Sequence, residues 1–336
     1  MRGTDLERIQ LMRRVRLVLF LAGIGGLAFL VSLIGIDALA AAFAELRWWQ
    51  FLLVCLPYSL IMLVDTLGWR YAFARDRAPF CRLLGARIAG DAVNVVTAMA
   101  SVGGEALKAW LIRRDVPYEE SVPSVVIAKT TITIAQALFL LVGIGVAWAV
   151  LSLDSVVVRT MLWLLAVEVV AVGGFFLAQV VGLVRRGGRL LAWLGVADDT
   201  SYAERLDLAL REFYWRDRGR FLLSVGFHFG GWLLGALETY LMLVVLRVPV
   251  PLPTAIVIEA FGSAVRFATF LIPANIGATE GANAAAFAAL GFTGSAGLAF
   301  SLVRRGRQAV WVVIGLLTLV AMRSGAWLTR PRRSPA

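Results

Sequence analysis

The sequence predicts an all-α, polytopic integral membrane bundle with about six full spans and two broken, re-entrant helical segments. Three observations predict this class: 60% of the 336 residues are hydrophobic, only 16% are charged, and the mean hydropathy is +0.81. In soluble globular proteins roughly half of the residues are apolar and about a quarter are charged. The composition therefore excludes a soluble enzyme of this length and also a disordered chain.

Six apolar runs approach or exceed the roughly 20 residues that a helix needs to cross a bilayer. They are Leu17–Ile36, Trp48–Trp69, Thr130–Leu153, Thr160–Val184, Phe221–Leu246 and the shorter Gln308–Met322. Their only charged or histidine side chains are Asp65, Glu168, His228 and Glu238. The first run is expected to be an uncleaved span, because its apolar core is too long for a typical signal peptide.

Two further stretches, 83–112 and 253–303, are rich in Gly, Ala and Pro and are interrupted by charges. Helices broken in this way are tolerated at membrane depth where their backbone is buried in protein or lines a wet cavity. Residues 101–105 and 275–280 both run from a polar residue through a β-branched residue and Gly to Glu. This similarity predicts an inverted repeat within a single transmembrane domain that covers residues 1–336.

The basic surplus is mostly arginine, since only two of the 33 basic residues are lysines. Arginines cluster before the first run, after the second and fourth, and at the C-terminal end, so both termini are predicted to be cytoplasmic. This distribution assigns the net charge of +11 to topology and argues against nucleic-acid binding, which needs a solvated basic face.

Residues 190–220 form the longest polar segment, and they predict a cytoplasmic amphipathic helix that lies along the bilayer, with Leu206, Leu210 and Phe213 on one face. No catalytic triad, nucleotide-binding loop or metal-ligand spacing is present. We therefore expect a protein that is not an enzyme and that uses no cofactor or metal.

Polar residues in the broken segments and in one span predict a binding site, because ionisable groups at membrane depth are costly and usually face a cavity. The Gly103-Gly104 pair is expected to leave free N–H groups, an anion site, at the start of the next helix. Lys129, Thr133 and Gln136 form one polar stripe, and Glu259, Ser263 and Arg266 form another with the same spacing. The candidate site comprises Asn94, Gly103, Gly104, Glu105, Lys108, Lys129, Glu259, Arg266, Pro273, Asn275, Gly277, Glu280, Arg304 and Arg305.

Each group also has a purely structural interpretation. The Gly-Gly-Glu stretch fits a capped helix end, and Lys129 fits a lysine that reaches back to the interface. Glu259 and Arg266 fit an ion pair inside a packed bundle. For His228, which lies among glycines that permit close helix packing, we favour a hydrogen-bonded packing residue over a proton relay.

Two stretches carry a resemblance to a known family. One runs from Asn94 through Gly103-Gly104-Glu105-Ala-Leu-Lys108 to Lys129, and the other runs from Glu259 through Arg266, Pro273-Ala-Asn-Ile-Gly277-Ala-Thr-Glu280 and Arg304-Arg305. They resemble the lysylphosphatidylglycerol synthase transmembrane, flippase-like family, and in particular its hopanoid-associated branch.

The resemblance implies a multi-pass protein of the bacterial inner membrane that moves or binds a polar-headed lipid, anionic or zwitterionic. It implies membrane lipids as partners (phospholipid, aminoacyl-phospholipid or hopanoid-type) and allows a homo-oligomer or a lipid-synthesis partner enzyme. The aminoacyl-transferase domain of the full-length synthases does not appear in this sequence, so synthase activity is not expected. Two alternatives stay open: a scaffold that presents lipid to a synthase or glycosyltransferase, and an ion-coupled transporter of small solutes.

Overall fold

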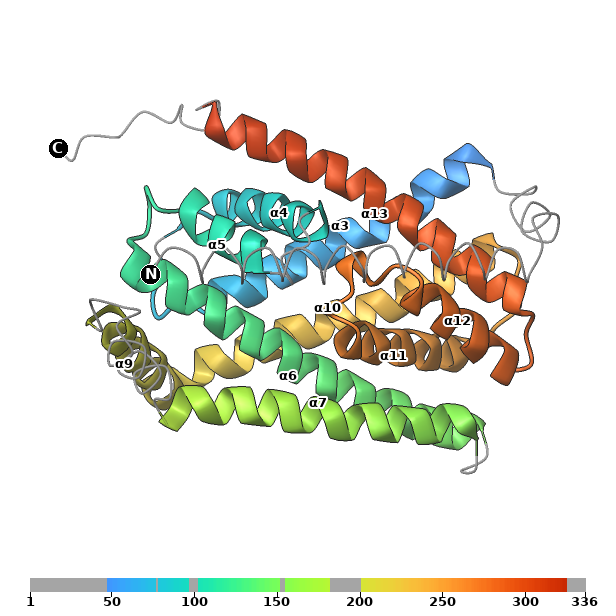
Figure 1. Ribbon diagram of the computed structural model, residues 1–336. Coiled ribbons are helices and arrows are strands. Elements are labelled where there is room, and N and C mark those ends of the chain that lie inside the picture. Colours follow the sequence, from blue (N-terminus) through green and yellow to red (C-terminus); the bar gives the residue numbers. More distant parts are fainter. Residues whose placement is uncertain (1–46, 77, 97–101, 152–154, 182–200, 325–336) are drawn as a thin grey trace, which may run out of the picture.

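The computed structural model describes residues 47–76, 78–96, 102–151, 155–181 and 201–324, and in these residues it is helical without strands. Five helices are long and apolar enough to cross a membrane: α3 (Trp48–Tyr71), α6 (Tyr118–Val150), α7 (Val156–Val181), α10 (Arg218–Val245) and α13 (Gly294–Arg323). Figure 1 shows them crossing the bundle from side to side, with α6 and α13 inclined one way and α3 and α10 the other. The predicted polytopic class is confirmed, whereas the expected span at 17–36 lies outside the described residues.

Two pairs of shorter helices correspond to the predicted broken segments. The first pair is α4 (Phe80–Val96) and α5 (Val102–Leu111); the second is α11 (Leu252–Ala268) and α12 (Ala278–Ala289), with the short 3₁₀ turn η1 (Pro273–Asn275) between them. The second break uses left-handed backbone, with φ of 51° at Ala274, 53° at Asn275 and 80° at Gly277. Only the glycine adopts this conformation without steric cost, so the turn is under local strain.

The second broken segment is shorter than expected. Thr293 caps the start of α13 by accepting a hydrogen bond from the Ala296 N–H at 3.2 Å, so the helix begins at Gly294. Residues 294–303, which the sequence assigned to the broken segment, are therefore the first turns of the last span. As a result Arg304, Arg305 and Arg307 lie in the middle of one long helix.

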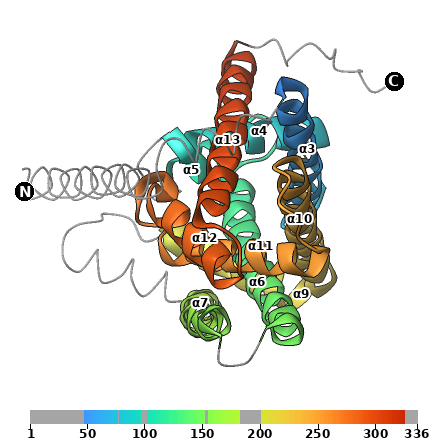
Figure 2. The ribbon, with the colours of Figure 1, turned by 90° about the vertical axis from the view of Figure 1, so that its right-hand side faces the viewer.

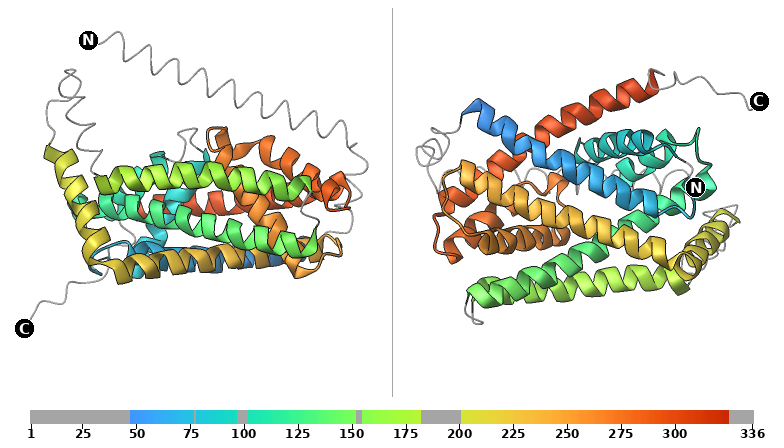
Figure 3. Two further views of the ribbon diagram at one scale, coloured as in Figure 1. Left: turned by 90° about the horizontal axis from the view of Figure 1, so that it is seen from below. Right: turned by 180° about the vertical axis from the view of Figure 1, so that it is seen from behind.

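The order of helices repeats with inverted direction. α3–α4–α5–α6 and α10–α11–α12–α13 each run long, short, short, long, and corresponding helices begin 170 to 176 residues apart (Trp48 to Arg218, Tyr118 to Gly294). α3 and α10 pack against each other and run in opposite directions in Figure 1 and in the rear view of Figure 3. α4 packs on α13 and α11 packs on α6, so each broken segment lies against the closing helix of the other repeat. This is the arrangement that an inverted repeat requires.

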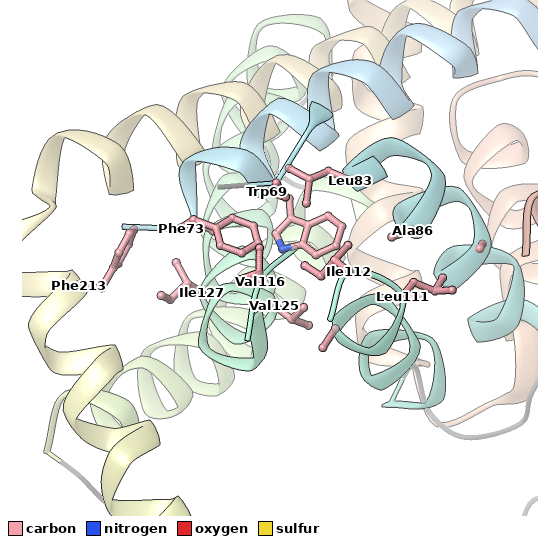
Figure 4. Close-up of a cluster of buried hydrophobic side chains, with 14 of the residues drawn as sticks. Trp69, Phe73, Leu83, Ala86, Leu111, Ile112, Val116, Val125, Ile127 and Phe213 are labelled. Carbon is pink, nitrogen blue, oxygen red and sulfur yellow. The ribbon is translucent and has the colours of Figure 1, made fainter. Parts of the chain in front are cut away.

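One apolar core lies where α3, α4, α5 and α6 meet α9 (Ser201–Arg216), as Figure 4 shows around Trp69, Phe73 and Ile127. The α9 side chains Leu210 and Phe213 are 0% and 3% exposed in this core. The apolar face of α9 thus packs on protein, whereas the sequence placed it along the bilayer. The helix also ends at Arg216, before the expected boundary, and residues 190–200 of that expectation lie outside the described residues.

Candidate functional site

A cavity of about 740 Å³ lies between the two broken segments, and α3, α6, α7, α10 and α13 complete its wall. Eight of the fourteen predicted site residues line it: Asn94, Lys129, Glu259, Arg266, Asn275, Glu280, Arg304 and Arg305. Of the other six, Gly104, Glu105 and Lys108 contact lining residues, and Gly103, Pro273 and Gly277 lie at the helix breaks. The structure therefore brings residues that are far apart in the sequence around one space.

The α11 stripe forms an ion-pair cluster with α10 and α13. The carboxylate of Glu259, which is 4% exposed, accepts hydrogen bonds from Arg266 Nη2 at 2.8 Å, from the Thr239 hydroxyl at 2.6 Å and from Arg304. The structural interpretation of Glu259 and Arg266 as a neutralising pair is thus correct. It does not account for the whole guanidinium, because Arg266 Nη1 is buried with no hydrogen-bond partner in the described residues.

Glu280 holds the second break to the last span. Its Oε2 accepts the Gly277 N–H at 2.7 Å, which caps α12, and its Oε1 accepts from Arg305 Nε at 2.7 Å. Arg305 also donates to the carbonyl of Ala274 at 2.6 Å, and the Asn275 side chain accepts from the Thr269 hydroxyl at 3.0 Å. The strained turn is fixed by side chains of both α12 and α13.

The first break is closed within its own segment. Asn94 Oδ1 accepts the Gly104 N–H at 2.8 Å, and Asn94 Nδ2 donates to Glu105 at 3.3 Å. The Lys108 ammonium lies 3.1 Å from Glu105 and 2.7 Å from Asp91. The Gly104 N–H, which the sequence assigned to an anion, is therefore already occupied by Asn94, and the capped-end interpretation is correct at this position.

Sequence reasoning missed a buried network on α3, α4 and α10. Arg87 Nη2 lies 2.8 Å from Asp65 Oδ2, and His228 Nδ1 lies 2.9 Å from Asp65 Oδ1. His228 is thus a hydrogen-bonded residue at a helix contact, as expected. A second missed pair, Glu238 and Arg307, is separated by 3.3 Å. In the sequence, these networks are indicated only by Asp65 and Glu238, because each is a charged residue inside a predicted apolar span.

The cavity wall carries one more base than acid. The acids are Asp65, Asp91, Glu238, Glu259 and Glu280, and the bases are Arg87, Lys129, Arg266, Arg304, Arg305 and Arg307. Each acid forms an ion pair with a base of the cavity wall or of its second layer. Lys129 is exposed, and its ammonium has no hydrogen-bond or ion-pair partner among the described residues. The excess positive charge therefore resides at Lys129, beside the polar stripe that continues to Gln136.

The cavity is polar on one side and apolar on another. Val172 and Phe175 of α7 line it together with Phe270 and Leu271 of the second break, which are 56% and 60% exposed. The rest of the wall carries the charges together with further apolar side chains, among them Ile61 and Met62 of α3. In the described residues there is no group of three or more His, Cys, Asp or Glu side chains that fits a metal ion, and Cys55 and Cys81 are free thiols.

Comparison with known proteins gives one match. The model of the lysylphosphatidylglycerol synthase TM region matches residues 15–316, which include both broken segments and the cavity wall. No curated protein and no solved structure matches the chain. Since the match covers far more than half of the sequence, the chain belongs to the family of the lysylphosphatidylglycerol synthase transmembrane region.

Proposed function

We propose that the protein is a lipid translocase that accepts an anionic or zwitterionic head group in its cavity. The observation that carries this proposal is the cationic lining of the cavity, where the Lys129 ammonium has no partner among the described residues and the ion-paired Arg266 keeps a buried Nη1 without a hydrogen bond. An unpaired cation at membrane depth raises the free energy of the protein, and a phosphate-bearing group would stabilise it through charge-assisted hydrogen bonds.

The apolar wall supports a lipid as the occupant. A head group near Lys129 leaves the acyl chains to pack along Phe270 and Leu271, whose exposed side chains suit hydrocarbon. A small polar solute would gain no binding free energy from contact with these apolar side chains. This feature favours the translocase over the alternative of an ion-coupled solute transporter.

The inverted repeat supports transport over scaffolding. Two broken segments from opposite ends of the bundle converge on one cavity, which is the architecture that alternating access uses. A scaffold that only presents lipid needs no such symmetry. We place the protein in the bacterial inner membrane with both termini cytoplasmic, and we propose that it acts without cofactor or enzymatic activity.

Reconstituted vesicles test the proposal. The purified protein should speed the transbilayer movement of a fluorescent phospholipid, and Lys129→Glu should slow it about tenfold or more, because one charge-assisted contact becomes a repulsion. Lys129→Arg keeps the charge and should keep the rate. Arg216→Ala, on the exposed surface of α9, is the matched control.

Three results would contradict the proposal. Lys129→Glu and Arg266→Ala that both move lipid at the wild-type rate would show that the site is misassigned. An inactive wild-type protein that co-purifies with a lipid-synthesis enzyme would support the scaffold. Solute uptake that depends on membrane potential, without lipid movement, would support the ion-coupled transporter.

A further inference from the structure

Glu168 lies on the inner face of α7 in a setting unlike that of the other acids in the bundle. It is 0% exposed, and neither carboxyl oxygen has a hydrogen-bond partner in the part of the chain that the structure describes. One turn to either side, Leu165 and Val172 continue the same face, and Leu165 packs into an apolar cluster built with α6 and α11. Along α7, the Glu168 side chain is therefore flanked by apolar side chains.

The other buried carboxyls of the spans and broken segments are compensated by bases. Asp65 pairs with Arg87, Glu238 with Arg307, and Glu280 with Arg305, while Glu259 has two arginine partners. Removing one partner of a buried ion pair leaves the other as an isolated charge and lowers the free energy of unfolding by several kcal/mol. An ionised Glu168 would be an isolated buried charge of this kind, because it has no base beside it among the described residues. The packing of α7 therefore favours the neutral carboxylic acid.

The charged side chains of α6, α11 and α12 that line the cavity are paired with other residues or face the cavity. On α11, Glu259 and Arg266 pair with each other, and on α12 Glu280 pairs with Arg305. On α6, Lys129 lines the cavity. The α9 side chain Tyr214 bonds Gln179, eleven residues or about 16 Å further along α7. In the part of the chain that the structure describes, none of them forms an ion pair or hydrogen bond with Glu168.

Glu168 nevertheless lies close to water. Ala171 and Val172, on the next turn of α7, line the cavity. Figure 2, which looks along the bundle, places α7 at the edge of the described helices, where it packs on α6 and α11. The carboxyl thus lies between an apolar contact and a polar cavity, on a helix held mainly by that contact.

We propose that Glu168 is a proton-binding site that links protonation to the position of α7, and this inference deepens the proposed translocase and rests on it. The neutral acid lets α7 pack on α6 and α11 and close one wall of the cavity. When the carboxyl releases its proton to cavity water, the carboxylate leaves the apolar contact and α7 moves outward with it. A proton gradient is then the class of driving force that the cavity uses.

A thiol accessibility experiment tests the movement without relying on transport. A Cys55→Ser protein that carries Ala171→Cys reports the cavity wall, and the native, exposed Cys81 reports the ordinary effect of pH on a thiol. Between about pH 5 and about pH 9, the labelling of position 171 by a water-soluble maleimide, relative to Cys81, should rise roughly threefold or more as Glu168 ionises. With Glu168→Gln added, the ratio should stay at its low-pH value.

A carbodiimide tests the neutral acid directly. The proton of a neutral carboxyl passes to a nitrogen of dicyclohexylcarbodiimide, its oxygen bonds the central carbon, and the adduct rearranges to a stable N-acylurea that mass spectrometry detects. Wild-type protein should carry this adduct at Glu168 and not at the ion-paired Glu259. The adduct should be lost at high pH and in Glu168→Gln.

The outcomes separate this inference from the proposed function. A wild-type protein that moves lipid, but whose 171-to-81 labelling ratio does not depend on pH, overturns the proton site and leaves the translocase intact. The absence of an adduct on Glu168 in folded wild-type protein overturns it as well. A pH-dependent ratio that Glu168→Gln abolishes, in a protein that moves no lipid, supports the proton site and contradicts the translocase.

Discussion

The two broken segments are equivalent in position but differ in how their charges are satisfied. In α4–α5 the contacts of Asn94, Gly104, Glu105 and Lys108 stay between residues 91 and 108. In α11–α12 the acids reach out of the segment, since Glu259 and Glu280 pair with arginines of α13. The polar contacts at the first break thus stay within the segment, although Arg87 of α4 pairs with Asp65 of α3, whereas the acids of the second segment pair with a neighbouring helix.

This difference suggests a division of labour between the repeats. α5 can move together with the adjoining end of α4 without breaking the ion pairs of Lys108, although the Arg87–Asp65 pair ties α4 to α3. A segment tied to α13 transmits any shift of that helix to the strained turn at Ala274, because Arg305 contacts both the turn and Glu280. We therefore expect stability to depend more on the acids of the second segment than on those of the first.

The largest predicted effect is at Glu280. Glu280→Gln leaves the Arg305 charge without its counterion, so the free energy of unfolding in detergent should fall by about 3 kcal/mol. Glu105→Gln should cost about 1 kcal/mol, because Glu105 is partly exposed and Lys108 keeps Asp91. Thermal unfolding midpoints measure both.

A double variant sharpens this test. Removing both charges with Glu280→Gln and Arg305→Gln should cost less than the sum of the single changes, because no isolated charge is left behind. If Glu105→Gln and Glu280→Gln lowered the free energy of unfolding equally, the acids of the two segments would contribute equally to stability, which would contradict this comparison.

A smaller effect is predicted where α4 and α5 approach most closely. A Cβ at Gly104 would lie 2.0 Å from the Gly90 carbonyl oxygen and 2.4 Å from Asn94 Oδ1. Gly104→Ala should therefore push the helices apart and cost about 1–3 kcal/mol. Gly174→Ala is the matched control, since nothing lies within 4 Å of its Cβ position, and it should be neutral or stabilising. A neutral Gly104→Ala would show that α4 and α5 are not a tightly closed unit.

Much of this architecture follows from one-dimensional patterns. Apolar run length predicted the spans at α3, α6, α7, α10 and α13, and composition predicted both broken segments. The pair Glu259 and Arg266 followed from helical periodicity, because both residues lie on one helix face. Properties that depend on spacing along a single helix can thus be read from the sequence.

Contacts between helices could not be predicted in this way. Asp65 and His228 are 163 residues apart, and nothing local pairs Glu280 with Arg305. The same limit explains two contacts that the sequence did not predict. Asn94 reaches the Gly104 N–H from the preceding helix, and α9 packs its apolar face on the core because α6, α7 and α10 lie against it there. Both depend on a fold that brings distant residues together.

The smallest predicted effect compares the caps of the two repeats. Asn94 caps the start of α5 inside the bundle, and Thr293 caps α13 at an exposed position. Asn94→Ala should cost about 1–2 kcal/mol, since it leaves a buried N–H without a partner, and Thr293→Ala about 0.5–1 kcal/mol. Because the two caps share no contact, the costs should add in the double variant, as measured by thermal unfolding. A clearly non-additive result would mean that the packing of α4 on α13 couples the two caps, and the two segments would then differ only in how strongly each depends on α13.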